Sequence, residues 1–262
     1  MKIFDAGDVR LHYRVEGPDD GQPVVFANSL GTDMRLWDPV LPLLPKGLRI
    51  IRYDKRGHGL SSIPSGPYSM GALVSDCEKL LDHLGVRDCM FVGLSIGGMI
   101  AQGLAVKRLD LVRAVVLSNT AAKIGTKTMW DDRISAVQQG GVEALADATM
   151  ERWFSKSFRA TPEMELWRNM LVQQAADGYN GCSAAISGTD FFTPTSGLRL
   201  PALGIAGSED GATPPDLVRE TLDLIPGSQF RLIRKAGHLP CAEQPQEYAA
   251  ILTEFFKSAG HI

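Results

Sequence analysis

The chain has 262 residues, of which 44% are hydrophobic and 22% are charged, a composition typical of a globular protein. Lys and Arg total 27 against 30 Asp and Glu, so the formal net charge at pH 7 is −3. This balance lacks the basic surplus that binds phosphate backbones and argues against a nucleic-acid partner. Because the sequence shows no signal-peptide pattern and no long apolar run, we expect a cytoplasmic protein without a membrane partner.

Four cysteines are scattered along the chain, at Cys77, Cys89, Cys182 and Cys241. None forms a C-x-x-C pair or stands at metal-ligand spacing from a histidine, so we expect reduced, buried thiols and no metal. Cys241 lies close to His238, but a catalytic cysteine there would leave the serine motif described below without a role.

The predicted elements begin with two β-rich segments, Met1–Phe4 and Val9–Glu16. Short apolar strands then alternate with amphipathic helices, a pattern that predicts parallel strands joined by right-handed crossovers. The predicted strands are Pro23–Ala27, Leu48–Tyr53, Cys89–Val92, Ala114–Leu117, Ala202–Ala206 and Gln229–Ile233. The predicted helices are Trp37–Leu44, Ser69–Leu84, a segment from Ile96, Pro215–Ile225 and Pro245–Lys257.

This alternation stops after Asn119. From about Ala121 to Phe192 the sequence predicts helices that carry aromatic side chains, with no convincing strand. We interpret residues 121–192 as a helical cap inserted after the sixth strand. The core domain would then consist of residues 1–120 and 193–262.

A G-x-S-x-G motif is centred on Ser95. The motif alone is weak, but it follows a predicted strand and opens a predicted helix, which is the context of a nucleophile elbow. Gly93 and Gly97 would allow the strand and helix backbones to approach each other around a strained serine. Ser95 is therefore the predicted nucleophile.

A serine hydroxyl needs a neighbouring base, and the order expected on such a sheet is serine, then acid, then histidine. His238 fits this order because it follows the strand Gln229–Ile233, in a loop at the carboxyl edge of the sheet. His58 is the competing base, although it precedes Ser95 and lies in a tight turn. The other histidines, His12, His83 and His261, are predicted to be structural or solvated.

The acid must reach the loop that holds His238 in order to orient its imidazole. The strand Ala202–Ala206 is followed by Glu209 and Asp210, and we favour Asp210 while Glu209 stays open. The end of the strand Ala114–Leu117 carries no carboxylate.

Acyl transfer also requires two backbone N–H donors for the oxyanion. Ile96, directly after the predicted nucleophile, is expected to supply one of them. The loop after the strand Pro23–Ala27 is expected to supply the other, from Leu30 or alternatively from Ser29.

Several blocks of the sequence resemble α/β-hydrolases, namely Phe26–Thr32, Trp37–Asp38, Arg52–Ser61, Gly93–Gly98 and Gly207–Pro215. A narrower combination joins Asn28-Ser29-Leu30-Gly31 to Gly93–Met99 and to the lid segments Trp130–Arg133 and Arg152–Phe154. That combination is similar to 3-oxoadipate enol-lactonases, over essentially the whole chain. The resemblance implies the α/β-hydrolase fold, with a mostly parallel twisted sheet flanked by helices, and a carboxylic ester hydrolase.

The resemblance also implies a substrate, a small five-membered enol-lactone with an acetate arm. It would be opened to 3-oxoadipate during bacterial catabolism of aromatic compounds, without a metal or organic cofactor. The substrate carboxylate calls for a cation, for which Arg133 is the candidate, with Trp130 and Trp153 as pocket walls. The remaining lid cations, Arg152, Lys156, Arg159 and Arg168, are expected at the surface.

Other functions of the same fold stay as alternatives: a carboxylesterase, a C–C bond hydrolase, a cofactor-free haloperoxidase, or a catalytically silent ligand-binding protein. Silent members commonly lack part of the triad, whereas Ser95, Asp210 and His238 are all present. We expect a monomer or a small homo-oligomer.

Overall fold

A computed structural model describes residues 1–262 and contains one eight-stranded sheet with the order β1-β2-β4-β3-β5-β6-β7-β8. Its strands are β1 (Lys2–Asp5), β2 (Arg10–Glu16), β3 (Gln22–Ala27), β4 (Leu48–Tyr53), β5 (Cys89–Leu94), β6 (Val112–Ser118), β7 (Ala202–Gly207) and β8 (Gln229–Ile233). The pairs β1–β2 and β2–β4 are antiparallel, and all other pairs are parallel. This arrangement confirms the predicted, mostly parallel α/β sheet.

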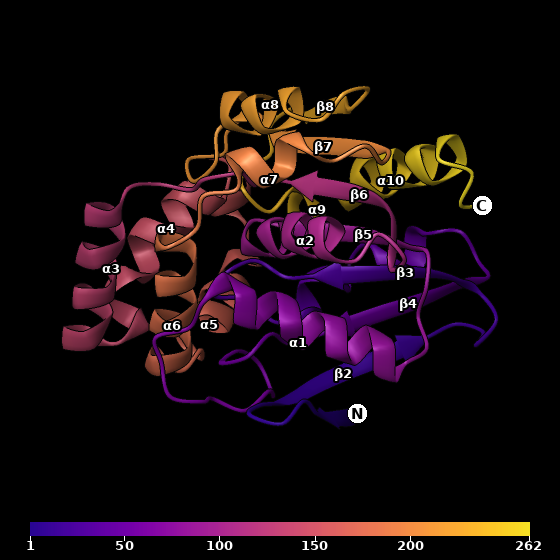
Figure 1. The fold of residues 1–262 in the computed structure, drawn as a ribbon. Coiled ribbons are helices and arrows are strands. Elements are labelled where there is room, and N and C mark those ends of the chain that lie inside the picture. Colours follow the sequence, from indigo (N-terminus) through magenta and orange to yellow (C-terminus); the bar gives the residue numbers. More distant parts are fainter.

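The helices that follow core strands include α1 (Met70–His83), α2 (Ile96–Lys107), α8 (Pro215–Asp223), α9 (Pro240–Glu243) and α10 (Pro245–Ser258). Between β6 and β7 the chain forms only helices: α3 (Lys127–Gly140), η3 (Val142–Leu145), α4 (Ala146–Trp153), η4 (Phe158–Ala160), α5 (Met164–Val172), α6 (Ala176–Ser187) and α7 (Phe192–Ser196). In Figure 1, α3 to α6 gather on the side toward which the arrows of β3 and β6 point. They therefore lie beside the carboxyl edge of the sheet. None of the helices combines the length and apolar character needed to cross a bilayer.

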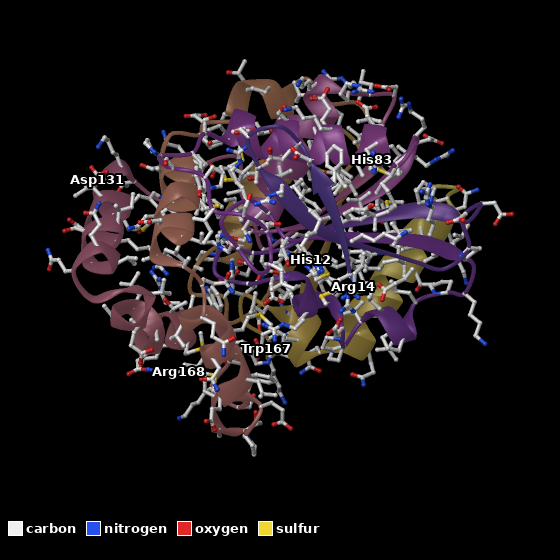
Figure 2. The ribbon with its side chains drawn as sticks, turned by 90° about the horizontal axis from the view of Figure 1, so that it is seen from below. His12, Arg14, His83, Asp131, Trp167 and Arg168 are labelled. Atoms are coloured by element: carbon white, nitrogen blue, oxygen red, sulfur yellow. The ribbon has the colours of Figure 1, made fainter.

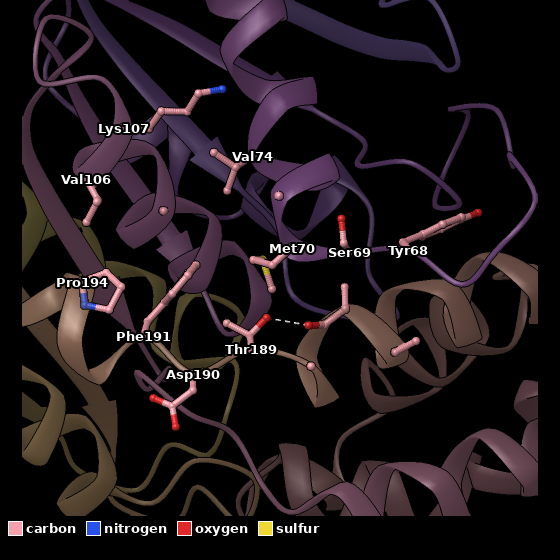
Figure 3. A pocket seen from close by; sticks show the side chains of 15 residues that line it. Tyr68, Ser69, Met70, Val74, Val106, Lys107, Thr189, Asp190, Phe191 and Pro194 are labelled. Carbon is pink, nitrogen blue, oxygen red and sulfur yellow. Dashed lines mark hydrogen bonds between the residues drawn. The ribbon is translucent and has the colours of Figure 1, made fainter.

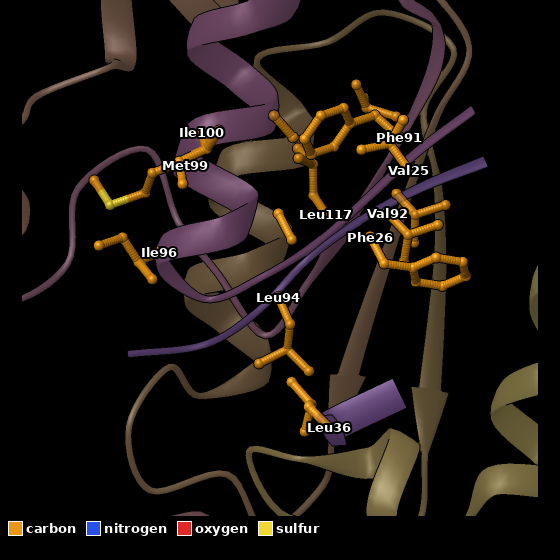
Figure 4. Close-up of a cluster of buried hydrophobic side chains, with 14 of the residues drawn as sticks. Val25, Phe26, Leu36, Phe91, Val92, Leu94, Ile96, Met99, Ile100 and Leu117 are labelled. Carbon is orange, nitrogen blue, oxygen red and sulfur yellow. The ribbon is translucent and has the colours of Figure 1, made fainter. Parts of the chain in front are cut away.

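The central strands are buried on both faces because layers lie on either side of them. Val25 and Phe91 face α2, whereas Phe26 faces the opposite layer, where its ring lies 4.8 Å from that of Trp37. Figure 4 shows α2 on one side of these strands and Leu36 on the other. Such double burial explains why these strands are continuously apolar rather than alternating.

One predicted helix, Trp37–Leu44, is wrong. The structure has two short 3₁₀ helices instead, η1 (Met34–Trp37) and η2 (Leu41–Leu43). Pro39 and Pro42 lie in this segment, and a proline has no N–H to continue a helical hydrogen-bond ladder. The helical spacing of apolar residues is therefore present without a continuous helix.

Candidate active site

Ser95 lies at a sharp turn between β5 and α2, with a φ of 58° and a ψ of −119°. This left-handed backbone is unfavourable for a residue with a side chain and is typical of strained functional sites. A Cβ at Gly93 would lie 2.2 Å from the carbonyl oxygen of Gly97, and one at Gly97 would lie 2.1 Å from that of Ala27. Glycine is thus required at both positions by backbone contact.

The structure brings Asp210 and His238 together from two loops at the carboxyl edge, after β7 and β8. Nδ1 of His238 lies 2.9 Å from Oδ2 of Asp210, and both side chains are buried. His238 lines the same cavity as Ser95. The Ser95 hydroxyl makes no side-chain hydrogen bond, and catalytic hydrogen bonds of this kind often tighten only around the substrate.

The carboxylate of Asp210 accepts hydrogen bonds at both oxygens. Oδ2 accepts from Nδ2 of Asn119 at 2.8 Å and from the Thr213 hydroxyl at 2.9 Å, while Oδ1 accepts from the N–H groups of Ala212 and Thr213. Burial alone would raise the pKa of Asp210, but His238 and these donors outweigh burial and lower the pKa. Asp210 is therefore held as an anion.

Asn119 is a residue that the sequence analysis missed. It stands at the end of β6, where no carboxylate was found, and its amide instead supports the carboxylate after β7. The signal was its place at the carboxyl end of a central strand. Glu209, the alternative acid, accepts from the backbone N–H of Lys156 in the cap and does not contact His238.

The predicted oxyanion donors face the same cavity. Ser29 and Leu30 line it, together with Ser95, and Ile96 is the first residue of α2, whose N–H has no partner within the helix. The N–H groups of Leu30 and of the alternative Ser29 both lack an acceptor in the protein. In addition, the Ser29 hydroxyl lies 3.5 Å from Nε2 of His238.

Lys55 and His58 hold the loop that carries Leu30. The buried ammonium of Lys55 donates to the carbonyl oxygens of Ser29, at 2.6 Å, and Thr32, at 3.2 Å. Nε2 of His58 accepts the N–H of Gly31 at 3.0 Å. Burial, with the nearby charge of Lys55, lowers the pKa of His58 well below its ordinary value. The competing base is thus a neutral structural group.

The cavity that Ser95 lines has a volume of about 110 Å³. The ring of Trp153 stacks beside that of His238, with centroids 6.2 Å apart. Trp130 also lines the cavity, but its indole N–H already donates to the carbonyl of Ile124 at 2.7 Å. Both tryptophans lie where cavity walls were predicted, and Trp130 offers a surface rather than a hydrogen bond.

Arg133 and Arg152 both line this cavity. Arg133, on α3, is the predicted cation, whereas Arg152, in the last turn of α4, was expected at the surface, and that expectation is wrong. The reason is a contact between segments far apart in sequence. The end of α4 packs on the loop after β7 that carries Asp210, where the N–H of Gly211 donates to the Arg152 carbonyl. Lys156 and Arg159 are exposed as expected, and Arg168 forms ion pairs on the cap surface (Figure 2).

The end of α4 also binds the histidine loop. The N–H of His238 donates to the carbonyl of Trp153 at 2.7 Å. Glu243, on α9, accepts from the N–H of Gly237 at 2.6 Å and from both the N–H and the hydroxyl of Ser155. The backbone at the end of α4 therefore helps to fix the position of His238.

None of the remaining histidines and cysteines lines this cavity. His12 is buried against Asp54 at 2.8 Å on β2 (Figure 2), His83 stacks on Phe4, and His261 bonds the carbonyl of Pro23. The four cysteines are unpaired and buried, and burial raises the pKa of the Cys182 thiol to about 12. They are placed as predicted, as small apolar residues.

A larger cavity, of about 660 Å³, lies elsewhere (Figure 3). It lies between the start of α1, the end of α2 and the end of α6, with Met70, Val74 and Phe191 among its walls. It does not include Ser95, Asp210 or His238, so size alone does not identify the reactive site.

Comparisons with known proteins agree with this geometry. A model described as "Alpha/beta hydrolase family" matches residues 24–251. The 3-oxoadipate enol-lactonase 2 of Acinetobacter baylyi is 34% identical over 253 residues, which cover 93% of this chain and 91% of that protein. The crystal structure of the enol-lactonase from Burkholderia xenovorans LB400 superimposes with a TM-score of 0.94 at 33% identity, covering 98% of this chain and 100% of that chain.

A further solved structure, a hydrolase from Pseudomonas aeruginosa PA01, is 35% identical with a TM-score of 0.93, and the match covers 97% of both chains. These matches therefore include both the strands of the sheet and the helices between β6 and β7. The strained serine, the buried acid–histidine pair and these relatives together lead to one conclusion. The chain is a hydrolase that belongs to the α/β hydrolase family, in the group that includes the 3-oxoadipate enol-lactonases.

Proposed function

We propose that this chain opens 3-oxoadipate enol-lactone to 3-oxoadipate through a Ser-His-Asp triad and an acyl-enzyme, in bacterial aromatic catabolism. The observation that carries the proposal is the 2.9 Å contact between Asp210 and His238 at the cavity lined by the Ser95 turn. The relationship to enol-lactonases supports the choice of substrate.

In the first step, Oγ of Ser95 bonds to the lactone carbonyl carbon while Nε2 of His238 takes the hydroxyl proton. Asp210, whose pKa is low, stabilises the resulting imidazolium. The charge that develops on the carbonyl oxygen is stabilised by the N–H groups of Leu30 and Ile96. The ring C–O bond then breaks, and the leaving enol oxygen receives the proton from His238.

The second step returns the enzyme to its starting state. Because the broken bond was part of a ring, the enol stays attached to the acyl chain, which is now an ester of Ser95. Water attacks this ester while His238 takes its proton, and the proton passes to the departing serine oxygen. The released enol tautomerises to the ketone, and the atoms and protons of the proposed reaction balance without a cofactor.

Arg133, Trp130 and Trp153 are proposed to hold the substrate. All three line the cavity, and the guanidinium of Arg133 lies 5.9 Å from the Trp130 ring centroid. A guanidinium is suited to a carboxylate because it keeps its positive charge and donates charge-assisted hydrogen bonds. The acetate arm of the lactone would therefore point toward α3.

Active-site labelling tests the proposed nucleophile directly. A fluorophosphonate probe should attach to Ser95 in the wild type, as located by peptide mass spectrometry, and should not attach in Ser95→Ala. Ser196→Ala, at an exposed serine outside the cavity, is the matched control and should label like the wild type. A wild type that does not label, or that labels elsewhere, would remove the serine-hydrolase mechanism.

A further inference from the structure

The charged groups around the cavity are unbalanced. Its only permanently charged side chains are Arg133 and Arg152, and none of its lining residues is Asp or Glu. Neither arginine forms an ion pair with any carboxylate of the protein. Guanidinium groups are seldom brought together at a partly buried site without an anion, because each raises the free energy of the other.

Arg133 is positioned by neutral partners from two other cap helices. Its Nε donates to the hydroxyl oxygen of Tyr179 on α6 at 2.7 Å, and its Nη2 donates to the hydroxyl of Thr149 on α4 at 3.0 Å. Its Nη1 makes no hydrogen bond. The Tyr179 hydroxyl accepts from Arg133, and its own proton has no acceptor. Burial raises the pKa of Tyr179, so this proton is retained.

Arg152 has even fewer partners. Its side chain donates no hydrogen bond, and its Nε is buried without a partner. Burial, with the charge of Arg133, lowers the pKa of its guanidinium. The last turn of α4 favours a cation, which accounts for an arginine on this turn. It does not account for a buried N–H group without an acceptor.

We propose that Arg152, Arg133 and the Tyr179 hydroxyl form one anion subsite that binds a carboxylate of the acyl substrate. A carboxylate has two oxygens and about four acceptor positions, which matches three donors that lack acceptors. The proposal rests on the proposed function, since the anion must belong to the chain that Ser95 attacks. It deepens that function by naming the class of substrate: lactones and half-esters of short dicarboxylic acids.

Arg152 is the specificity-determining residue in this scheme. Nε and Nη2 of Arg133 already donate to the hydroxyls of Tyr179 and Thr149, so Arg133 has few N–H groups left for an anion. The guanidinium of Arg152 makes no hydrogen bond within the protein. Arg152 lies beside the loop that carries Asp210, where its backbone carbonyl accepts the N–H of Gly211. An anion between the two arginines would therefore be contacted from both sides of the cavity.

Binding of adipate to the Ser95→Ala protein tests the subsite without turnover. Isothermal titration calorimetry should detect adipate but not adipamide, its neutral counterpart. Adding Arg152→Met should weaken adipate binding about tenfold or more, the usual effect of losing charged hydrogen bonds. Tyr179→Phe, which removes only the hydroxyl, should weaken it severalfold. Arg159→Met, at an exposed arginine of the same cap, is the control and should not change it.

A pair of esters supplies the second readout. Arg152→Met should lower kcat/KM for 4-nitrophenyl hydrogen glutarate at least tenfold, mainly through KM, and change 4-nitrophenyl pentanoate less than threefold. Arg152→Lys should recover part of the loss, which guards against a folding defect in the methionine variant. Equal losses on both esters, or adipate binding that does not depend on Arg152, would overturn the subsite. Failure of Ser95 to label would instead overturn the hydrolase mechanism, because adipate binding does not require the nucleophile.

Discussion

At the scale of single residues, the site depends on one carboxylate in a fixed position. Asp210 accepts from His238, Asn119 and Thr213 while it is almost wholly buried. These donors keep Asp210 anionic and favour the His238 proton on Nδ1, which leaves Nε2 free to act as the proposed base. Glu209 is next to it in sequence, but its side chain is turned to the cap backbone.

Substituting Asp210 and Glu209 one at a time should show which of the two acids contributes to catalysis. Asp210→Asn should lower kcat for 4-nitrophenyl acetate by roughly 10⁴-fold, because an amide cannot stabilise the imidazolium and favours the wrong tautomer. Glu209→Gln, the matched control, should change kcat less than threefold. The reverse pattern in steady-state kinetics would show that the acid has been misassigned.

At the scale of elements, the turn between β5 and α2 is defined by backbone contacts. Gly97 lies against the carbonyl of Ala27 on β3, so the helix can begin close to the sheet only without a side chain there. A methyl group added at Gly71, in the first turn of α1, would have no neighbour closer than 3.8 Å, and the helical backbone there suits other residues. The two glycines therefore differ in how strictly their surroundings require them.

Alanine at each glycine should give opposite effects on stability. Gly97→Ala should lower the free energy of unfolding by about 3 kcal/mol or more, because a methyl group 2.1 Å from a carbonyl oxygen forces the elbow apart. Gly71→Ala should raise it by up to about 1 kcal/mol, by reducing the entropy of the unfolded chain. Urea unfolding followed by circular dichroism measures both, and a tolerated Gly97→Ala would contradict the close approach.

Elements with local signals could be predicted from the sequence. The strands Leu48–Tyr53 and Gln229–Ile233 have the predicted bounds, and α1 lies within the predicted Ser69–Leu84 because Ser69 caps it by accepting the N–H of Ala72. The meeting of Ser95 and His238 at one cavity could be predicted because both follow strands whose carboxyl ends lie at the same edge of the sheet. These patterns depend on residues close to one another in sequence.

The inward position of Arg152 could not be predicted in this way. It follows from the docking of α4 on the loop at Gly211, which is far away in sequence. The support of Asp210 by Asn119 has the same origin, since it depends on the pairing of β6 with β7. Contacts between distant segments, rather than periodicity, decide which side chains complete the site.

At the scale of the whole molecule, the buried side chain of Lys55 connects the loop after β3 to the loop after β4. Lys55 has no carboxylate partner within hydrogen-bond distance, and its ammonium bonds only to the carbonyl oxygens of Ser29 and Thr32. Burial lowers the pKa of Lys55 from 10.5 to about 8. The folded protein therefore loses this proton at lower pH than the unfolded chain does.

This difference in pKa makes the contribution of Lys55 to the free energy of unfolding depend on pH. Between pH 8 and about 10.5 the unfolded chain holds a proton that the folded protein has lost, so this group makes the free energy of unfolding rise with pH. Buried cysteines and tyrosines titrate in the same range, so the comparison must be with Lys55→Met. The stability of the wild type relative to this variant should rise by about 1 to 2 kcal/mol between pH 8 and 9.5. A constant or falling difference in urea unfolding would contradict the buried ammonium.

The most direct test of the proposed function is turnover of freshly prepared 3-oxoadipate enol-lactone beside simple esters and unsubstituted lactones. We expect kcat/KM for the enol-lactone to exceed that for the neutral compounds at least a hundredfold, with 3-oxoadipate as the product, and Ser95→Ala to lose several orders of magnitude. An enzyme that hydrolyses neutral esters as well as the enol-lactone, or a Ser95→Ala variant that keeps more than about a tenth of the activity, would contradict it.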